Sequence, residues 1–245
     1  MSFLKNLFGG KADLFAEREH PYDFGAAAER GDLEKLKMLL EGDPRLVFCK
    51  DNDGWTTLHE AAGRGQTDVV ELLLVNKADV NVKNDFNVTP LHRAVLSNRQ
   101  DVAKLLLARN ANINAKNKDG RTPLHYAVDG LWREMLEFML TTKADIEAKD
   151  NNGMTPLHLA VEKDRGPYVA LLLDNKADIN ARDNEGKTPL HYAARKGCTA
   201  VAKLLLNRKA DANAKDNSGN IPLHYAEYYG YTGWSEFASK HDSHE

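Results

Sequence analysis

The sequence predicts an all-α protein built as a solenoid, in which helix–turn–helix units stack side by side and β-hairpin-like tips join them. Three observations lead to this prediction. A four-residue block recurs at a constant step of 33 residues, each block opens an apolar pattern of helical period, and a second apolar pattern follows in the same unit. A fixed period of this size indicates a repeat architecture, because one unit cannot bury its apolar side alone.

The recurring block consists of residue types that begin a helix. It reads Thr-Pro-Leu-His in most copies, and its first residues are Thr56, Thr89, Thr122, Thr155, Thr188 and Ile221. A Thr hydroxyl can accept a hydrogen bond from a free backbone N–H of the first helical turn. Proline fits the next position, where its missing N–H costs nothing. We therefore expect a capped helix after each Thr and an uncapped one after Ile221.

The remainder of each unit predicts a second helix and a tight turn. About ten residues after the block, an apolar stripe such as Val69, Val70 and Leu73 recurs at helical spacing. A turn then closes the unit at a glycine such as Gly54, which supplies the positive φ that a hairpin tip requires. Asn87 stands at one tip in place of Gly, and Asn tolerates positive φ better than most residues.

Helix, turn, helix and tip at a step of 33 residues, with Thr-Pro-Leu-His opening the units, resembles the ankyrin-repeat family over roughly residues 22–240. The resemblance implies about seven repeats including two caps. We expect an N-terminal capping or flexible segment at 1–21 and a degenerate capping repeat at 22–54. Five full repeats at 55–220 and a C-terminal capping repeat with a tail at 221–245 complete the chain.

Two departures from the family pattern give testable expectations. Where the family usually has Gly at the end of the second helix, this chain has Lys77, Lys143, Lys176 and Lys209. Left-handed backbone at a Lys costs about 1 kcal/mol relative to Gly, yet we expect positive φ at all four. Gly130 lies one place earlier than its equivalents in other units, so we expect the loop after it to be rebuilt.

Composition excludes several classes of protein. The 245 residues are 42% apolar and 28% charged with a net charge of −3, which permits a large buried core and argues against a dedicated nucleic-acid binder. The apolar runs are too short for a membrane span. Cys49 and Cys198 fall in distant units, too far apart for a disulfide, so we expect free thiols and a reducing, cytoplasmic location.

The N-terminal segment leaves three alternatives open. Phe3, Leu4, Leu7 and Phe8 fall on one side of a short helix. Residues 1–21 could cover the exposed end of the first unit as a cap, which terminal repeats require. They could also be a mobile tail, or an anchor for a membrane or a partner.

The histidines are the most conspicuous chemical groups, but their spacing argues against a metal site. The ladder contains His59, His92, His125, His158, His191 and His224. Zinc ligands must converge to about 2 Å from one ion, which residues one repeat apart cannot do. We expect each ring to bond backbone at a turn between adjacent units. The sequence has no phosphate-binding loop or nucleophile elbow, and we expect no enzymatic activity, cofactor or metal.

The resemblance implies that protein partners dock on the concave side, at the tips and the adjoining ends of the first helices. Large apolar groups at such positions, and charges beside them, are the candidate anchor and rim. Carried onto this chain, the candidate binding residues are Trp55, Phe86, Val88, Leu96, Arg121, Asp129, Met154, Lys187, Arg195 and Lys196. An alternative is that Trp55 and Phe86 merely pack on each other. Lys187, Arg195 and Lys196 suggest an acidic partner segment.

The expected function is that of a non-catalytic, monomeric scaffold or adaptor for a protein partner. A dedicated inhibitor or immunity-type subunit of one enzyme is an alternative, as is a membrane-tethered scaffold that uses residues 1–21. Fold-level analogy supports protein binding and nothing narrower.

Overall fold

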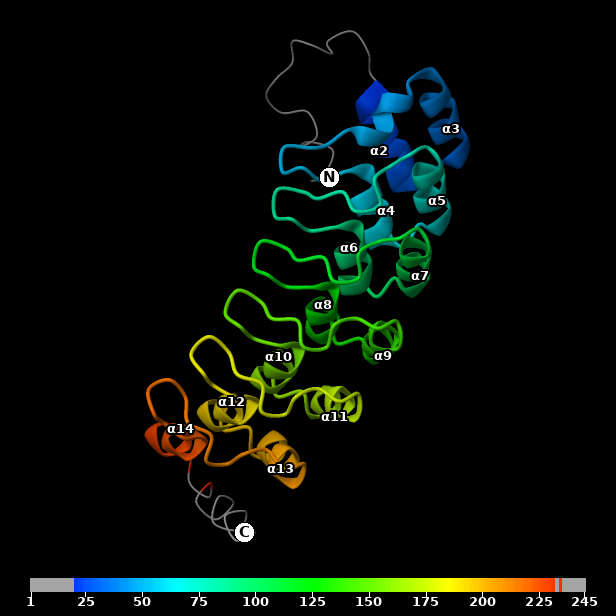
Figure 1. Cartoon of the computed structure of the whole chain (residues 1–245). Helices are drawn as coiled ribbons and strands as arrows, with labels where there is room; N and C mark the ends of the chain where they lie inside the picture. The colour runs from blue at the N-terminus through cyan, green and yellow to red at the C-terminus, as the bar shows by residue number, and fades with distance from the viewer. Residues whose placement is uncertain (1–19, 232–233, 235–245) are drawn as a thin grey trace. The chain divides into compact units, whose positions relative to one another are not determined.

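The computed structural model describes residues 20–231 and residue 234, and these form an all-α array (Figure 1). Within them, the only β-type pairing is an isolated bridge between Lys50 and Thr56. The chain divides into two compact units, Met1–Lys118 and Asp119–Glu245, here called the N-terminal and C-terminal units. The predicted helical solenoid is confirmed.

The N-terminal unit contains six α-helices and one 3₁₀ helix among its described residues. They are α2 (His20–Arg30), α3 (Leu33–Gly42), η1 (Pro44–Phe48), α4 (Thr57–Arg64), α5 (Thr67–Val75), α6 (Pro90–Leu96) and α7 (Gln100–Ala108). First helices pack on first helices, as α4 does on α6, and second helices on second helices, as α5 does on α7. These two layers bury the apolar stripes, with Leu58, Leu73 and Leu91 almost inaccessible to solvent.

The C-terminal unit repeats the same arrangement. Its helices are α8 (Pro123–Asp129), α9 (Arg133–Thr141), α10 (Pro156–Glu162), α11 (Gly166–Asp174), α12 (Pro189–Lys196), α13 (Thr199–Asn207) and α14 (Pro222–Tyr228). The first helices α8, α10, α12 and α14 form one layer, and α11 packs on α13 in the other. Trp234, which follows α14, is buried. The expectations for residues 1–19 and for the C-terminal tail lie outside the described residues.

The recurring Thr starts the helices in the predicted way. The Thr56 hydroxyl accepts a hydrogen bond from the His59 backbone N–H, while the His59 ring accepts one from the Thr56 N–H, so each satisfies a donor that helix geometry leaves open. Thr89 and Thr155 make the same reciprocal pair with their histidines. Ile221 provides no such side-chain cap.

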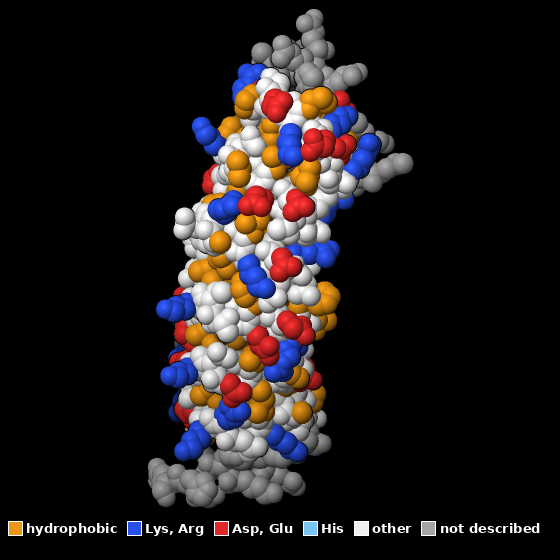
Figure 2. Space-filling model, turned by 90° about the vertical axis from the view of Figure 1, so that its right-hand side faces the viewer, with side chains coloured by type: hydrophobic (Ala, Val, Ile, Leu, Met, Phe, Trp, Pro, Cys, Tyr) orange, Lys and Arg blue, Asp and Glu red, His pale blue; other side chains and the backbone are white. Residues whose placement is uncertain are grey.

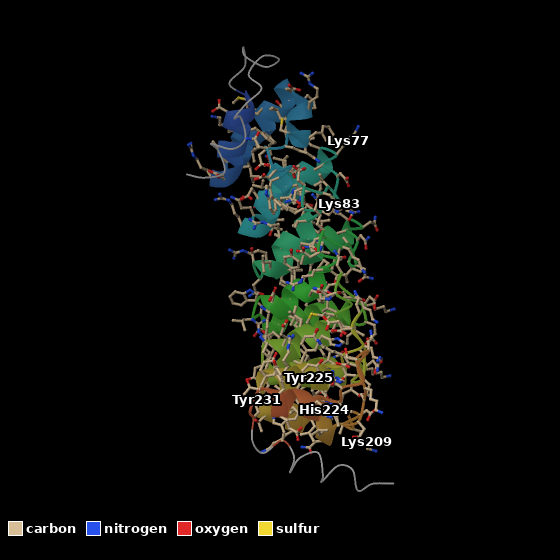
Figure 3. The ribbon with its side chains drawn as sticks, turned by 90° about the vertical axis from the view of Figure 1, so that its left-hand side faces the viewer. Lys77, Lys83, Lys209, His224, Tyr225 and Tyr231 are labelled. Carbon is tan, nitrogen blue, oxygen red and sulfur yellow. The ribbon has the colours of Figure 1, made fainter. Side chains whose placement is uncertain are left out.

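Left-handed backbone recurs at fixed places in each repeat. Lys77, Lys143, Lys176 and Lys209 have φ of 69°, 63°, 70° and 67°, and Asn87 has φ of 56°. The predictions for the lysines and for Asn87 are confirmed. Figure 3 shows Lys77 at the periphery of the N-terminal unit. Each of these lysines lies just after the C-terminus of a second helix. The helix dipole stabilises a cation there, which offsets part of the strain of the left-handed backbone.

The loop between α8 and α9 corrects one prediction. It is not rebuilt: α8 and α9 occupy the same repeat positions as α6 and α7. Gly130 keeps a right-handed φ of −77°, and Leu131 takes the left-handed conformation with φ of 63°. The packing of the helices on either side fixes the path of this loop. Leu131 therefore adopts the left-handed backbone of the turn, which costs free energy at a residue other than glycine.

No helix among the described residues combines the length and apolar character needed to cross a bilayer.

Candidate functional site

The tips of the N-terminal unit present aromatic side chains toward solvent. Phe86 is 51% exposed, Leu96 at the end of α6 is 36% exposed, and Trp55 is half-buried. The indole of Trp55 meets the His59 ring edge-on, with ring centroids 5.4 Å apart, and the Arg93 guanidinium lies over it at 5.0 Å. Among the described residues, no ring contact joins Trp55 to Phe86.

Val88 and Met154 are buried, with 7% and 6% of their surface exposed, which corrects their assignment to an exposed anchor. The backbone explains their burial. The Val88 N–H donates to Asn84 Oδ1 at 2.8 Å, and the Val88 carbonyl accepts from His59 Nε2 at 2.9 Å. Because both backbone groups are held against the repeat, the side chain that follows the tip is directed inward.

Met154 is held in the same way by Asp150 and His125. The recurring histidine is therefore a connector between adjacent repeats, as predicted. His158 and His191 bond the carbonyls of Lys187 and Asn220 at 3.1 Å. None of the described residues forms a group of three or more ligands suited to a metal ion.

The hydrogen bonds of these histidines define their neutral tautomer. His59 Nδ1 faces the Thr56 N–H at 3.2 Å and must accept, so Nε2 carries the proton that it donates to Val88. Burial disfavours the charged ring and lowers the pKa of His59 to about 4. Burial also lowers the pKa of His158 and of His191. These rings are structural groups that remain neutral at pH 7.

Most of the predicted charges of the C-terminal unit are paired within that unit. Arg121 lies 3.3 Å from Asp129, and Arg195 lies 3.2 Å from Glu162. Lys187 pairs with Glu185. Lys196 is exposed at the end of α12. Internal pairing reduces the field that Lys187 and Arg195 could offer to an acidic partner.

A tyrosine–carboxylate pair recurs in the C-terminal unit and was missed by the sequence reasoning. The hydroxyl of Tyr192 donates to Asp183 at 2.6 Å, and Tyr225 donates to Asp216 at the same distance. Figure 3 shows Tyr225 on α14. A spacing of nine residues between an Asp before the tip and a Tyr on the next first helix is the signal that could have revealed both.

The face formed by the second helices differs in character from the tips. In Figure 2 its acidic and basic side chains are interspersed, with apolar groups between them. Arg109–Glu71 and Arg208–Asp174 are pairs of this kind, at 2.9 and 2.8 Å. The second helices also carry exposed apolar side chains, Met38 on α3 and Val75 on α5.

Known proteins share the repeat pattern with this chain. The chain is 42% identical over 53 residues to the 2-5A-dependent ribonuclease of Mus musculus, which covers 22% of this chain and 7% of that protein. It is 44% identical over 57 residues to the serine/threonine-protein kinase VIK of Arabidopsis thaliana, covering 23% of this chain and 13% of the kinase.

A third relative is the ankyrin repeat domain-containing protein 29 of Homo sapiens, 42% identical over 57 residues, or 23% of this chain and 19% of that protein. The chain thus spans less than a fifth of the length of each of these relatives. A family model described as ankyrin repeats matches residues 24–117, 109–183 and 171–237, which together cover most of the chain. Ankyrin repeats are generally protein-interaction modules, and this chain belongs to the ankyrin-repeat family.

Proposed function

We propose that the chain is a non-catalytic scaffold that binds a protein partner through the concave surface made by its hairpin tips and first helices. The anchor of this surface is the aromatic patch, defined as Trp55, Phe86 and Leu96. One observation carries the proposal: Phe86 keeps 51% of its surface exposed at a tip where an apolar ring gains nothing from water. Exposed apolar groups of this size are typical of binding surfaces, where aromatic residues are favoured anchors.

Backbone hydrogen bonds between successive tips support this proposal, because they hold the surface in shape before any partner arrives. The Asp85 N–H donates to the Asp53 carbonyl at 2.9 Å, and the Lys118 N–H donates to the Phe86 carbonyl at 2.8 Å. Phe86 therefore projects from a tip bonded into the array. A pre-formed surface loses little conformational entropy on association, so more of the contact energy appears as affinity.

The enzymes among the relatives do not argue for catalysis in this chain. Their similarity to it covers 7% of the mouse ribonuclease and 13% of the plant kinase. Our proposal assigns recognition to the repeats and leaves chemistry to whatever partner they bind.

The experiment starts from the purified chain, which is used to capture partners for identification by mass spectrometry. The affinity of the identified partner is then measured by calorimetry for wild type and for the double variant Trp55→Ala, Phe86→Ala. We expect the loss to exceed about 2 kcal/mol, or about thirtyfold in Kd.

Met38→Ala and Val75→Ala are matched controls, because both side chains are exposed apolar groups of the same unit on its second helices. They should leave the affinity unchanged. Wild-type affinity in the double variant, or an equal loss in the controls, would contradict the proposal.

A further inference from the structure

A three-residue cluster in the C-terminal unit combines a cation, a ring and a carboxylate. The Lys187 ammonium lies 5.3 Å from the centre of the Tyr225 ring, and the Tyr225 hydroxyl donates to Asp216 at 2.6 Å. Asp216 Oδ1 also accepts the N–H groups of Ser218 and Asn220 at its tip. Every polar group named here has its complement within the chain.

Four repeats earlier, the same three positions hold Trp55, Arg93 and Asn84. The ring and the cation have exchanged places, since the Arg93 guanidinium now lies over the Trp55 ring at 5.0 Å. Asn84 uses its side-chain oxygen as Asp216 does, accepting the N–H groups of Phe86 and Val88 at 3.0 and 2.8 Å. Its other atom, however, is an NH₂ donor where Asp216 has an acceptor.

The exchange leaves two donors without an acceptor. Asn84 is buried, with 3% of its surface exposed. Neither Asn84 Nδ2 nor Arg93 Nε finds a partner among the described residues. By the 33-residue register, Asn84 and Arg93 hold the positions of Asp216 and Tyr225, whose side chains meet. Buried donors without partners are rare in folded proteins and destabilise them, so two such donors at these positions call for an external acceptor.

The surrounding charges favour an anion as this acceptor. Arg93 reaches Glu60 at 3.4 Å, and Glu60 and Glu29 also face Arg64. The Arg93 guanidinium lies on the α4 backbone at Gly63, and Arg99 donates to the Gly63 carbonyl at 3.1 Å. Arg64 and Arg93 thus pair with two carboxylates, and Arg99 adds a third positive charge that bonds a neutral carbonyl. A carboxylate entering the cluster balances the third cation.

We propose that a bound protein partner inserts an Asp or Glu side chain between Asn84 and Arg93, next to an apolar residue that it places on Phe86. This inference rests on the proposed function and specifies the partner segment. One carboxylate oxygen accepts a hydrogen bond from Asn84 Nδ2, and the other accepts one from Arg93 Nε. The bond from Arg93 is charge-assisted at both ends.

The approach runs past the Arg93 guanidinium. The Arg93 side chain is partly exposed, whereas the two donor nitrogens are covered in the free protein. The guanidinium is held by the stack on Trp55 and by one long hydrogen bond to Glu60. In the proposed complex the guanidinium shifts along the indole face to meet the incoming carboxylate and keeps the cation–π contact.

The test uses a display library of random 12-residue peptides selected on the full chain. We expect enriched peptides to carry Asp or Glu beside Leu or Phe. Changing that acidic residue to Asn or Gln should weaken binding at least tenfold. Binding of the acidic peptide, but not of its amide form, should shift the side-chain Nε–H resonance of Arg93 in nuclear magnetic resonance spectra.

The decisive variant is Asn84→Asp, which supplies internally the acceptor that Asp216 supplies in the C-terminal unit. It should weaken the acidic peptide at least tenfold and leave the thermal midpoint equal to or above that of wild type. Asn52→Asp makes the same charge change at the tip of the preceding repeat and should leave binding unchanged.

The outcomes separate this inference from the proposed function. If the peptides need Phe86 but bind the Asn84→Asp variant with the affinity of wild type, the inferred carboxylate site is wrong and the proposed function still holds. The same holds if enriched peptides carry no acidic residue. Peptides that bind regardless of Phe86→Ala and Trp55→Ala contradict the proposed function itself.

Discussion

The N-terminal and C-terminal units share one scaffold and differ in how completely their tips satisfy themselves. In the C-terminal unit, Tyr192 and Tyr225 donate to carboxylates, and Arg195 and Lys187 have anionic partners. In the N-terminal unit, Phe86 is exposed and Asn84 Nδ2 finds no acceptor among the described residues. The positions that recur in every repeat build the fold, and the positions that vary decide whether the polar groups of a tip are paired within the chain.

Acidification probes what the two units share, and it should produce the largest effect. Burial lowers the pKa of His59 from its ordinary value of 6.5 to about 4, so the unfolded state binds its proton first as pH falls. The contribution of the neutral His59 ring to the free energy of unfolding is fully present above pH 6.5. It declines by about 3 kcal/mol as the pH falls to about 4. Urea unfolding at pH 7, 6, 5 and 4 measures the decline.

The control for this experiment is His59→Gln, which cannot titrate in this range. The difference in unfolding free energy between wild type and the variant should narrow as pH falls from 6.5 to 4. A difference that stays constant would mean that folding does not lower the pKa of the ring, so that Nδ1 takes its proton in spite of the Thr56 N–H that it faces.

Partner binding probes what separates the units. The variant Arg195→Ala, Lys196→Ala removes two cations of the C-terminal unit, of which Arg195 is already paired with Glu162. We expect a change below about 0.5 kcal/mol, against more than about 2 kcal/mol for loss of Trp55 and Phe86. Calorimetric titration of the same partner compares the two, and a larger loss in the C-terminal variant would reverse our assignment of the anchor.

The tyrosine hydroxyls test whether the C-terminal tips are internally stabilised. Tyr225→Phe removes the 2.6 Å bond to Asp216 and keeps the ring under Lys187. A hydrogen bond to a charged group contributes about 1.5 kcal/mol, and chemical denaturation should show a loss of that order. Tyr228→Phe is the matched control, since its side chain is 83% exposed. Equal stability of the two variants would argue against the pairing.

Backbone strain gives the smallest expected effect. Leu131 and Asn98 hold equivalent left-handed turns, with φ of 63° and 55°. Leu131→Gly should stabilise the chain by about 1 kcal/mol, because the exposed side chain loses little on removal. Asn98→Gly should gain less, since Asn tolerates this region. Thermal unfolding of both variants decides the order, and destabilisation by Leu131→Gly would show that the side chain packs usefully.

The period and the capping chemistry were sufficient to predict the solenoid and the helix starts, and the resemblance to the ankyrin-repeat pattern predicted the left-handed lysines. These features are local or repeat at each step, so one copy reinforces the next. The burial of Val88 and Met154 was not predicted, because it depends on hydrogen bonds that hold the tip from two neighbouring elements. The contact of Arg93 with Trp55 joins residues of adjacent repeats, and the spacing of residues along the sequence does not reveal the direction of side chains between repeats. For Leu131, packing of the flanking helices outweighed the preference of the residue.

Successive tips are joined through main-chain atoms: Asp85 donates to Asp53, Asn184 to Asn152, and Asn217 to Glu185, each near 3 Å. Bonds of this kind are indifferent to which side chain each tip displays. A whole 33-residue repeat could thus be replaced by another in register. The new repeat would bring its own tip side chains, and the same backbone hydrogen bonds would form to the neighbouring tips. The binding specificity of such a chain can therefore change one repeat at a time while the fold stays the same.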